Sequence, residues 1–210
     1  MNLPFDVAAL TSSPALLPLA TFIFVSSITP GPNNVMLTAS GANFGSQRRI
    51  PRMLGITLGC SLMLLMVGAG LGAVFEQMPQ LYTVLQYVGA AYLIWLAWKI
   101  ATSGRAQSTD AKPKPLSVLQ AAAFQWVNPK AWLMSVGVVA AYTSPNAYWS
   151  SLWLGAVVML VVNYPCISVW TLFGSGIGRW LQSARALQIF NGVMAFLLLL
   201  SLYPLFAGMH

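Results

Sequence analysis

Hydrophobic residues along this chain form long runs that are separated by short polar segments. Each run is close to the roughly 20 apolar residues that a helix needs to cross a hydrocarbon layer about 30 Å thick. The runs therefore predict an all-α polytopic membrane protein with six transmembrane helices. We place these helices near residues 15–40, 53–75, 81–100, 117–142, 149–173 and 186–206.

One long polar stretch, TSGRAQSTDAKPKP at residues 102–115, falls between the third and fourth runs. Its Ser, Pro and charge content is typical of a solvated linker. The linker divides a single membrane domain, residues 1–210, into two halves, 15–100 and 117–206. Because each half has an odd number of spans, the two halves would enter the membrane from opposite sides. This pattern predicts the inverted 3+3 repeat of many secondary transporters.

Charge is scarce and unevenly placed along the chain. Only 6% of the residues are charged and 58% are hydrophobic, whereas roughly a quarter of a soluble domain is charged. Nine of the ten Lys and Arg residues follow the first, third or fifth run. Because such loops stay in the cytoplasm, we expect both termini outside, in the periplasm. The net charge of +7 then faces an anionic leaflet and indicates no nucleic-acid partner.

Two of the predicted helices contain helix-breaking segments at corresponding positions. The first carries Thr29-Pro30-Gly31-Pro32-Asn33-Asn34, and the fourth carries Asn128-Pro129-Lys130. Proline removes a backbone donor and frees carbonyl groups, and lipid cannot satisfy them. We therefore predict that helices one and four are broken. The alternative is an ordinary pair of kinks in a packed bundle, because Pro and Gly are common in membrane helices.

The two breaks are the candidate site. Freed backbone groups and asparagine amides at the same depth offer hydrogen-bond donors and acceptors to a polar ligand. The candidate substrate-binding residues are Thr29, Pro30, Gly31, Pro32, Asn33, Asn34, Asn128, Pro129 and Lys130.

Lys130 places a cation near the middle of the fourth predicted helix, where a charge costs at least about 2.5 to 3.5 kcal/mol. The acids of the chain, Asp6, Glu76 and Asp110, all fall outside the predicted helices. Three states remain open: a lysine bound to freed carbonyls, a neutral amine, or a lysine bound to an anionic group such as a carboxylate. A structural role, in which Lys130 caps the broken end of helix one, is compatible with a binding role.

Other motifs suggest packing or a rival function. Gly55 with Gly59 and Gly41 with Gly45 have the spacing that lets membrane helices approach closely. We find no metal-ligand cluster, nucleotide loop or catalytic triad, and expect no cofactor and no metal. The rival from another class is a membrane thiol-disulfide relay enzyme that uses Cys60 and Cys166, although buried Cys is usually a small apolar filler.

Three segments carry a resemblance to a known family. SITPGPNNVML, GAAYLIWLAWK and FQWVNPKAW resemble the signature segments of the LysE/RhtB family of amino acid exporters. The order of the segments, the length and the six runs also match. The resemblance implies a multi-pass secondary exporter of the bacterial inner membrane, an antiporter driven by the proton gradient, and not an enzyme. The family's TPGPN segment falls on Thr29–Asn33, and its NPK segment falls on Asn128–Lys130.

The resemblance also has a departure that bears on the substrate. Exporters of basic amino acids in this family have an acid in the second run, which here reads GITLGCSLML. A site whose only charge is Lys130 should bind a carboxylate and repel a second cation. We therefore expect export of neutral amino acids such as threonine, homoserine, leucine or cysteine. Lys130 is a candidate to alternate between a proton and the substrate carboxylate, and chains of this kind often form homodimers.

Overall fold

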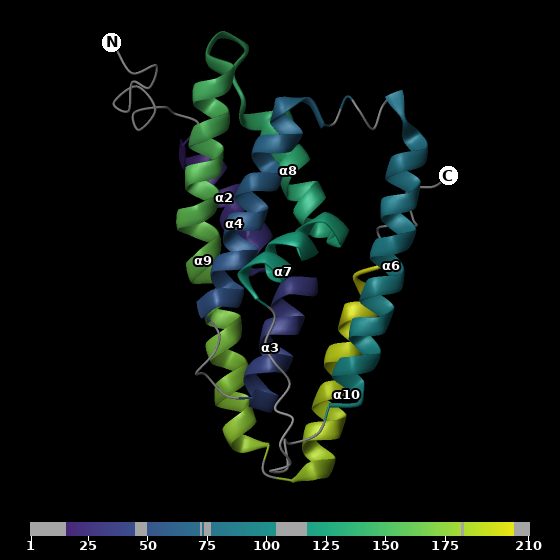
Figure 1. Ribbon diagram of the computed structural model, residues 1–210. Helices are drawn as coiled ribbons and strands as arrows, with labels where there is room; N and C mark the ends of the chain where they lie inside the picture. Colours follow the sequence, from purple (N-terminus) through teal and green to yellow (C-terminus); the bar gives the residue numbers. More distant parts are fainter. Residues whose placement is uncertain are drawn as a thin grey trace.

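The computed structural model describes residues 16–44, 50–71, 73, 77–103, 117–181 and 183–203, and within these ranges every regular element is a helix (Figure 1). The longer helices are α2 (Leu16–Ile28), α3 (Pro32–Phe44), α4 (Ile50–Met66), α6 (Pro79–Ala101), α8 (Pro129–Tyr142), α9 (Tyr148–Trp180) and α10 (Ala184–Leu200). The shorter elements are α7 (Val118–Ala123), a π-helical turn at Val67–Leu71 and 3-10 turns at Phe124–Val127 and Pro145–Ala147. The all-α prediction is confirmed for the described residues.

The first predicted helix is broken where the sequence predicts the break. α2 ends at Ile28 and α3 begins at Pro32, so Thr29, Pro30 and Gly31 connect them. Proline is favoured at the first position of α3 because its missing N–H would have no helical partner there. Each half has 13 residues, which corresponds to a length of about 20 Å. Only the two halves together approach the roughly 30 Å of a hydrocarbon layer.

The fourth predicted helix is broken at Asn128. α7 starts after Ser117, whose hydroxyl accepts a bond from the Gln120 amide at 3.2 Å, while Gln120 Oε1 accepts from the Ser117 amide at 3.0 Å. This reciprocal pair is a capping box. After a 3-10 turn the backbone is extended at Asn128, and α8 begins at Pro129. Both predicted breaks are therefore present.

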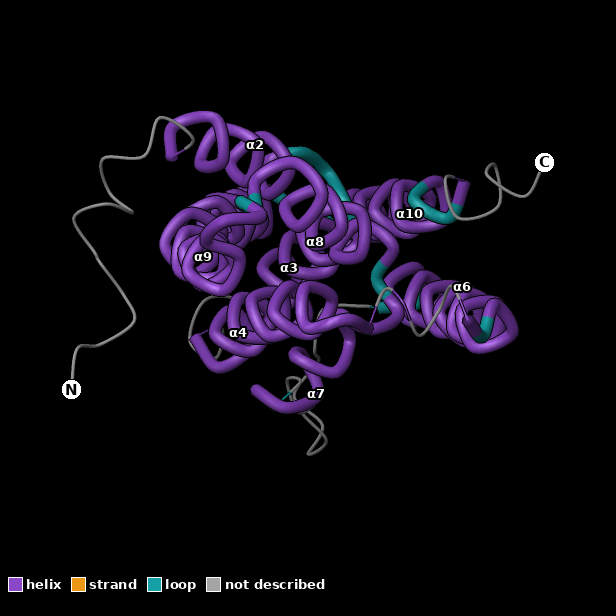
Figure 2. The backbone as a smooth tube through the Cα atoms, turned by 90° about the horizontal axis from the view of Figure 1, so that it is seen from above, coloured by secondary structure: helices purple, strands orange, loops and turns teal. Residues whose placement is uncertain are grey.

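The helix α9 packs along α3 through glycines. A Cβ atom on Gly174 would lie 2.7 Å from the Thr38 Cα, and one on Gly178 would lie 2.8 Å from the Ala42 Cα. The two backbones therefore touch without intervening side chains, as small residues permit in membrane helices. Figure 2 shows α3 and α8 near the centre of the bundle, with α2, α4 and α9 around them.

The predicted packing role of the second helix's glycines is also confirmed. A Cβ on Gly59 would lie 2.7 Å from the Ala122 Cα of α7, and Gly55 packs against the same short helix at Val118. Gly41 likewise packs against α9, with its Cβ position 2.8 Å from the Thr171 carbonyl oxygen. Its predicted partner Gly45 lies outside the described residues.

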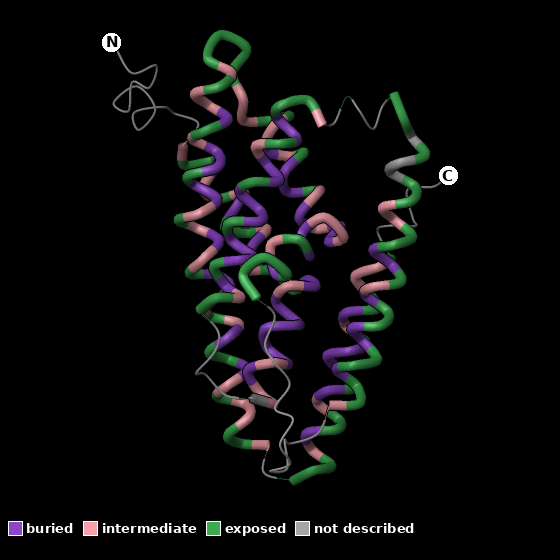
Figure 3. The backbone as a smooth tube through the Cα atoms, in the orientation of Figure 1, coloured by how far each residue is buried: buried purple, intermediate pink, exposed green. Residues whose placement is uncertain are grey.

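The helices α6 and α10 form a pair on one side of the bundle (Figures 1 and 2). Asn43 and Asn191 join this pair to α3 through two reciprocal amide bonds of 2.8 and 3.1 Å. Asn191 also donates to the Ser103 carbonyl at 2.7 Å. The outer surface of the pair is exposed (Figure 3) and includes Trp95 and Trp98. An apolar exterior of this kind suits a hydrocarbon solvent.

Three helical segments of the described chain are long and apolar enough to cross a membrane unaided: Ile50–Leu71, Thr83–Ala101 and Pro145–Trp180. The helix α10 and the helices on either side of the two breaks are shorter. The chain therefore has membrane-type helices, whereas the count of six spans stays a prediction.

Candidate functional site

Lys130 joins the two broken helices. Its Nζ donates to the Thr29 carbonyl oxygen at 2.6 Å, to Thr29 Oγ1 at 2.8 Å and to the Pro30 carbonyl oxygen at 3.2 Å. These contacts use all three donors of an ammonium group. They also place the positive charge at the C-terminal end of α2, the negative end of the helix dipole. Of the partners that the sequence left open, freed carbonyl groups are the ones that the structure shows.

The other carbonyl groups at the end of α2 have side-chain donors as well. Asn34 Nδ2 donates to the Ser27 and Thr29 carbonyl oxygens, both at 2.8 Å. Trp170 Nε1 donates to the Ile28 carbonyl oxygen at 2.9 Å. A carbonyl left unpaired away from water is costly, so these donors stabilise the broken end. Side chains from α3, α8 and α9 thus replace the hydrogen bonds that a continuous helix would make.

Gln125 is fully buried between the two breaks. Its Oε1 accepts from Asn33 Nδ2 at 2.8 Å and from Asn128 Nδ2 at 3.2 Å, and its Nε2 donates to Asn33 Oδ1 at 3.2 Å and to the Ala121 carbonyl at 2.9 Å. The Cys60 thiol also donates to Oε1 at 3.4 Å. Because buried polar groups in such networks strengthen one another, Gln125 links α3 firmly to the chain that precedes α8.

Asn163 ties α9 to the same region. Its Nδ2 donates to Ser27 Oγ at 3.0 Å, and its Oδ1 accepts from Thr57 Oγ1 at 3.2 Å. Asn163 is followed by Tyr164 and Pro165, and a proline inside a helix commonly kinks it. In the structure α9 is one helix through Pro165, and Asn163 is a buried bridge between α2 and α4.

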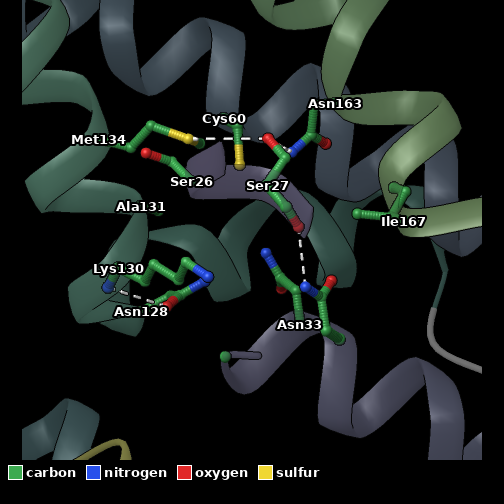
Figure 4. A pocket seen from close by; sticks show the side chains of 12 residues that line it. Ser26, Ser27, Asn33, Cys60, Asn128, Lys130, Ala131, Met134, Asn163 and Ile167 are labelled. Carbon is green, nitrogen blue, oxygen red and sulfur yellow. Dashed lines mark hydrogen bonds between the residues drawn. The ribbon is translucent and has the colours of Figure 1, made fainter. Parts of the chain in front are cut away.

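A small cavity lies where these side chains meet (Figure 4). Its volume of about 20 Å³ holds a water molecule and is too small for an amino acid. A larger molecule could be held there only if the surrounding side chains moved. Its lining comprises Ser26, Ser27, Gly31, Asn33, Asn34, Cys60, Asn128, Lys130, Ala131, Met134, Asn163 and Ile167.

The structure brings five of the nine candidate site residues to the cavity. They come from both breaks: Gly31, Asn33, Asn34, Asn128 and Lys130. Gly31 leaves room for the lysine side chain, because a Cβ atom at this position would lie 2.6 Å from Lys130 Cδ. The stem of the lysine therefore lies directly against the backbone of the first break.

The remaining four candidates do not line the cavity. Thr29 and Pro30 are exposed and supply the oxygen atoms that bind Lys130. Pro32 and Pro129 are the first residues of α3 and α8. These four residues position the site by shaping the backbone.

Sequence reasoning missed Gln125 and Ser27. Gln125 lies within the segment FQWVNPKAW, three residues before Asn128, and its amide in an apolar run is the signal that could have identified it. Ser27 lies in the polar pair just before the first break. A weakly polar serine is common in membrane helices, so its position alone carries little information.

Trp126 and Trp132, on either side of the second break, pack against each other. Trp132 Nε1 donates to the Trp126 carbonyl oxygen at 2.9 Å, and the two rings meet edge to face with centroids 5.9 Å apart. Neither is among the residues that line the cavity. Their geometry is that of an ordinary aromatic pair.

Cys60 and Cys166 are both buried and both free thiols. Cys60 lines the cavity as a hydrogen-bond donor to Gln125. Cys166 lies on α9 and is not part of the lining. The two thiols thus have different surroundings, and Cys166 packs as a small apolar residue.

The chemistry of the cavity is that of binding. Amides, hydroxyl groups and one ammonium surround it, and within the described residues no three His, Cys, Asp or Glu side chains come together as metal ligands. A bundle of membrane-type helices in which two helices break at a polar site is the architecture of a transporter.

Comparison with known proteins gives the same class. The profile of the family described as LysE type translocator matches residues 24–202, which include both helix breaks. The chain belongs to this family, so the resemblance seen in the sequence is confirmed. Membership points to a transporter rather than to an enzyme such as a thiol relay. No solved structure matches the chain.

Two curated relatives carry the same description. A cysteine/O-acetylserine efflux protein of Escherichia coli (strain K12) is 33% identical over 183 residues, which cover 85% of this chain and 90% of the relative. The cysteine/O-acetylserine efflux protein of Salmonella choleraesuis (strain SC-B67) is 32% identical over 145 residues, covering 68% of this chain and 72% of the relative. These matches support an amino acid exporter of the membrane.

Proposed function

We propose that the chain is a secondary transporter that exports small neutral amino acids or their derivatives across the bacterial inner membrane, with cysteine and O-acetylserine as the first candidates. One observation carries the proposal: two broken helices, joined through Lys130 and Gln125, meet at a polar cavity inside an apolar bundle. The names of the relatives supply the two candidate substrates.

The charge of the cavity supports a neutral substrate. Among the described residues, Lys130 is the only charged one that lines the cavity, and none of these lining side chains is a carboxylate. A substrate with a cationic side chain would meet repulsion without a counter-charge. A zwitterion has no net charge, and both of its charged groups find partners in freed carbonyls, amides and helix ends.

We also propose the inverted 3+3 repeat and the predicted orientation. The packing is reciprocal, because α4 contacts the first half of the fourth span, α7, while α9 contacts the first half of the first span, α2. Lys99 and Arg179 lie in the last turns of α6 and α9, and Arg185 lies in the first turn of α10. These three helix ends lie at the same end of the molecule (Figure 1). With that end cytoplasmic, both termini are periplasmic.

Of the further basic residues that the sequence assigns to the cytoplasmic side, Arg52 lies in the first turn of α4. The others are Arg48, Arg49, Arg105, Lys112 and Lys114, and they lie outside the described residues. Glycosylation or thiol accessibility of tagged termini measures the orientation directly. We also propose a homodimer, because short chains of this kind often pair. Crosslinking in native membranes tests for it.

Proton coupling is proposed to pass through Lys130. As an ammonium, Lys130 holds the end of α2, and as a neutral amine it has one acceptor pair and no charge with which to stay there. Lys130→Arg keeps the charge permanently and is expected to abolish pH-driven export while sparing binding. Driven export at the wild-type rate in this variant would contradict coupling through Lys130.

The export function is tested in cells fed with dipeptides, which release free amino acids inside. Wild-type chain is expected to accelerate the appearance of cysteine or another neutral amino acid outside the cell. Lys130→Ala should abolish the acceleration, and the matched control Lys99→Ala, which removes a cation far from the cavity lining, should retain it. Unchanged efflux of every amino acid with membrane-inserted wild-type chain would overturn the proposal.

A further inference from the structure

The ammonium of Lys130 fills a cage of oxygen atoms at the end of α2. The cage consists of the Thr29 carbonyl, the Thr29 hydroxyl and the Pro30 carbonyl, at 2.6, 2.8 and 3.2 Å from Nζ. Within the described residues no carboxylate takes part in this contact. Among the described residues the lysine is therefore held by dipoles, and such dipoles can hold any primary ammonium of suitable size.

The backbone builds this cage independently of the lysine. The carbonyls of Thr29 and Pro30 have no helical donors because the helix stops before Pro32. They also lie at the negative end of the α2 dipole, where a cation is favoured. Lys130 comes from the other half of the chain, 101 residues away, and reaches the cage only through its flexible side chain.

The other side of the break has the opposite polarity. The helix α3 begins at Pro32, and the backbone amides of Asn33 and Asn34 have no hydrogen-bond partner within the described residues. Free amides at the positive end of a helix dipole attract anions. The ends of α2 and α3 thus offer a cation site and an anion site next to each other, one for each charged group of a zwitterion.

We propose that the oxygen cage at Thr29 and Pro30 is the subsite for the α-ammonium of the exported amino acid, and that Lys130 occupies it as an internal surrogate when no substrate is bound. This inference rests on the proposed export of amino acids. Both groups are primary ammonium ions with three N–H donors and one positive charge. The cavity of about 20 Å³ lies beside Lys130 and Gly31, so the place that the lysine vacates adjoins it.

The cage is large enough for one ammonium group only, so the Lys130 ammonium and the substrate ammonium exclude each other. Three oxygen atoms satisfy one ammonium completely, so Lys130 and the substrate cannot be bound there together. The role differs from binding the substrate carboxylate, because substrate then displaces the lysine instead of pairing with it. A site that holds either the protonated lysine or the substrate ammonium makes the two compete, so binding of substrate releases the lysine and release of substrate lets the lysine return.

The test uses purified protein in detergent and small ammonium ions as probes. In Lys130→Ala the cage is vacant, and methylammonium at ten times its Kd should raise the Tm by about 3 °C. Wild-type protein, whose cage is filled, should show no such rise. Tetramethylammonium has the same charge and no N–H donor, so it should leave both proteins unchanged. An equal response of Lys130→Ala and wild type to methylammonium would overturn the proposal.

A second variant keeps the lysine and protects the test against misfolding of the first. In Gly31→Ala the new Cβ would lie 2.6 Å from Lys130 Cδ and 3.3 Å from Nζ. Gly31 does not have a positive φ, so its backbone accepts alanine. The variant should push the lysine from the cage and gain a response to methylammonium. No gain in a folded Gly31→Ala protein would count against the surrogate role.

Substrate analogues separate this proposal from the alternative role of Lys130. Cysteamine, which has the ammonium without the carboxylate, should stabilise Lys130→Ala more than wild type, and N-acetylcysteine, which lacks the ammonium, should affect the two proteins equally. Stabilisation of wild type by N-acetylcysteine that Lys130→Ala loses would assign Lys130 to the carboxylate and overturn the surrogate role. These measurements need no transport, so failure of the cage is distinguishable from absence of amino acid export.

Discussion

The Nζ atom of Lys130 lies 2.6 Å from the carbonyl oxygen of Thr29, although the two residues are 101 positions apart in the chain. The contact joins the broken first helix of one half to the broken fourth helix of the other. It also shows how a half-buried cation is held without an acidic partner among the described residues. The dipoles of the carbonyl groups that proline frees stabilise the ammonium, and the lysine in turn stabilises the break.

Gln125 should be essential to the stability of the site. Gln125→Leu keeps a similar volume and removes both partners of Asn33 and the acceptor of Asn128. We expect a loss of about 1 to 3 kcal/mol for each buried group left unpaired, measured as unfolding in detergent. The control is Gln188→Leu, at an exposed position of α10, which should change little. Equal stability of the two variants would show that the amide network is not stabilising.

The contact between α3 and α9 should tolerate no added methyl group. A Cβ on Gly174 would lie 2.7 Å from the Thr38 Cα, which as backbone cannot easily move. Gly174→Ala is expected to destabilise the protein by about 1 to 3 kcal/mol. Gly176→Ala, two residues along the same helix, meets nothing within 4 Å and should be neutral or stabilising by up to about 1 kcal/mol. The reverse order of the two unfolding temperatures would refute this packing.

Removal of the hydroxyl group should lower the stability of the protein at one buried serine and leave it nearly unchanged at another. Ser27 Oγ accepts a bond from Asn163 at 3.0 Å, whereas Ser135 Oγ has no partner within the described residues. Ser27→Ala leaves the buried Asn163 amide short of an acceptor and should cost about 1 to 3 kcal/mol. Ser135→Ala should lie within about 0.5 kcal/mol of wild type. Thermal unfolding of both variants checks the difference, and a larger loss for Ser135→Ala would be inconsistent with the observed bonding.

The sequence predicted the backbone of the site well, because the breaks depend on local chemistry. Two prolines and a glycine in succession, Pro30, Gly31 and Pro32, disfavour a continuous helix through local chemistry, and Asn128-Pro129 forms a cap and a first turn from residues adjacent in the chain. The depth of Lys130 in an apolar run likewise required a partner. Each of these inferences used neighbouring residues only.

The partners across the bundle could not be predicted in the same way. Gln125, Asn163 and Trp170 lie on helices whose faces are apolar on the lipid side as well as inside, so hydrophobic periodicity does not reveal which face is buried. Their roles follow from packing between distant segments. The contact between Trp126 and Trp132 likewise depends on how the chain turns at the second break.

Efflux from proteoliposomes tests the central claim most directly, that the joined helix breaks bind and release a neutral amino acid. Purified wild type, Lys130→Ala and the control Lys99→Ala are each reconstituted into vesicles that are loaded with labelled cysteine under reducing conditions. The vesicles are then diluted into a buffer of different pH, which imposes a pH gradient across the membrane. The account predicts rapid release from wild type and Lys99→Ala, and release at least about tenfold slower from Lys130→Ala, equivalent to about 1.4 kcal/mol in barrier height. Release from Lys130→Ala at the wild-type rate would contradict it.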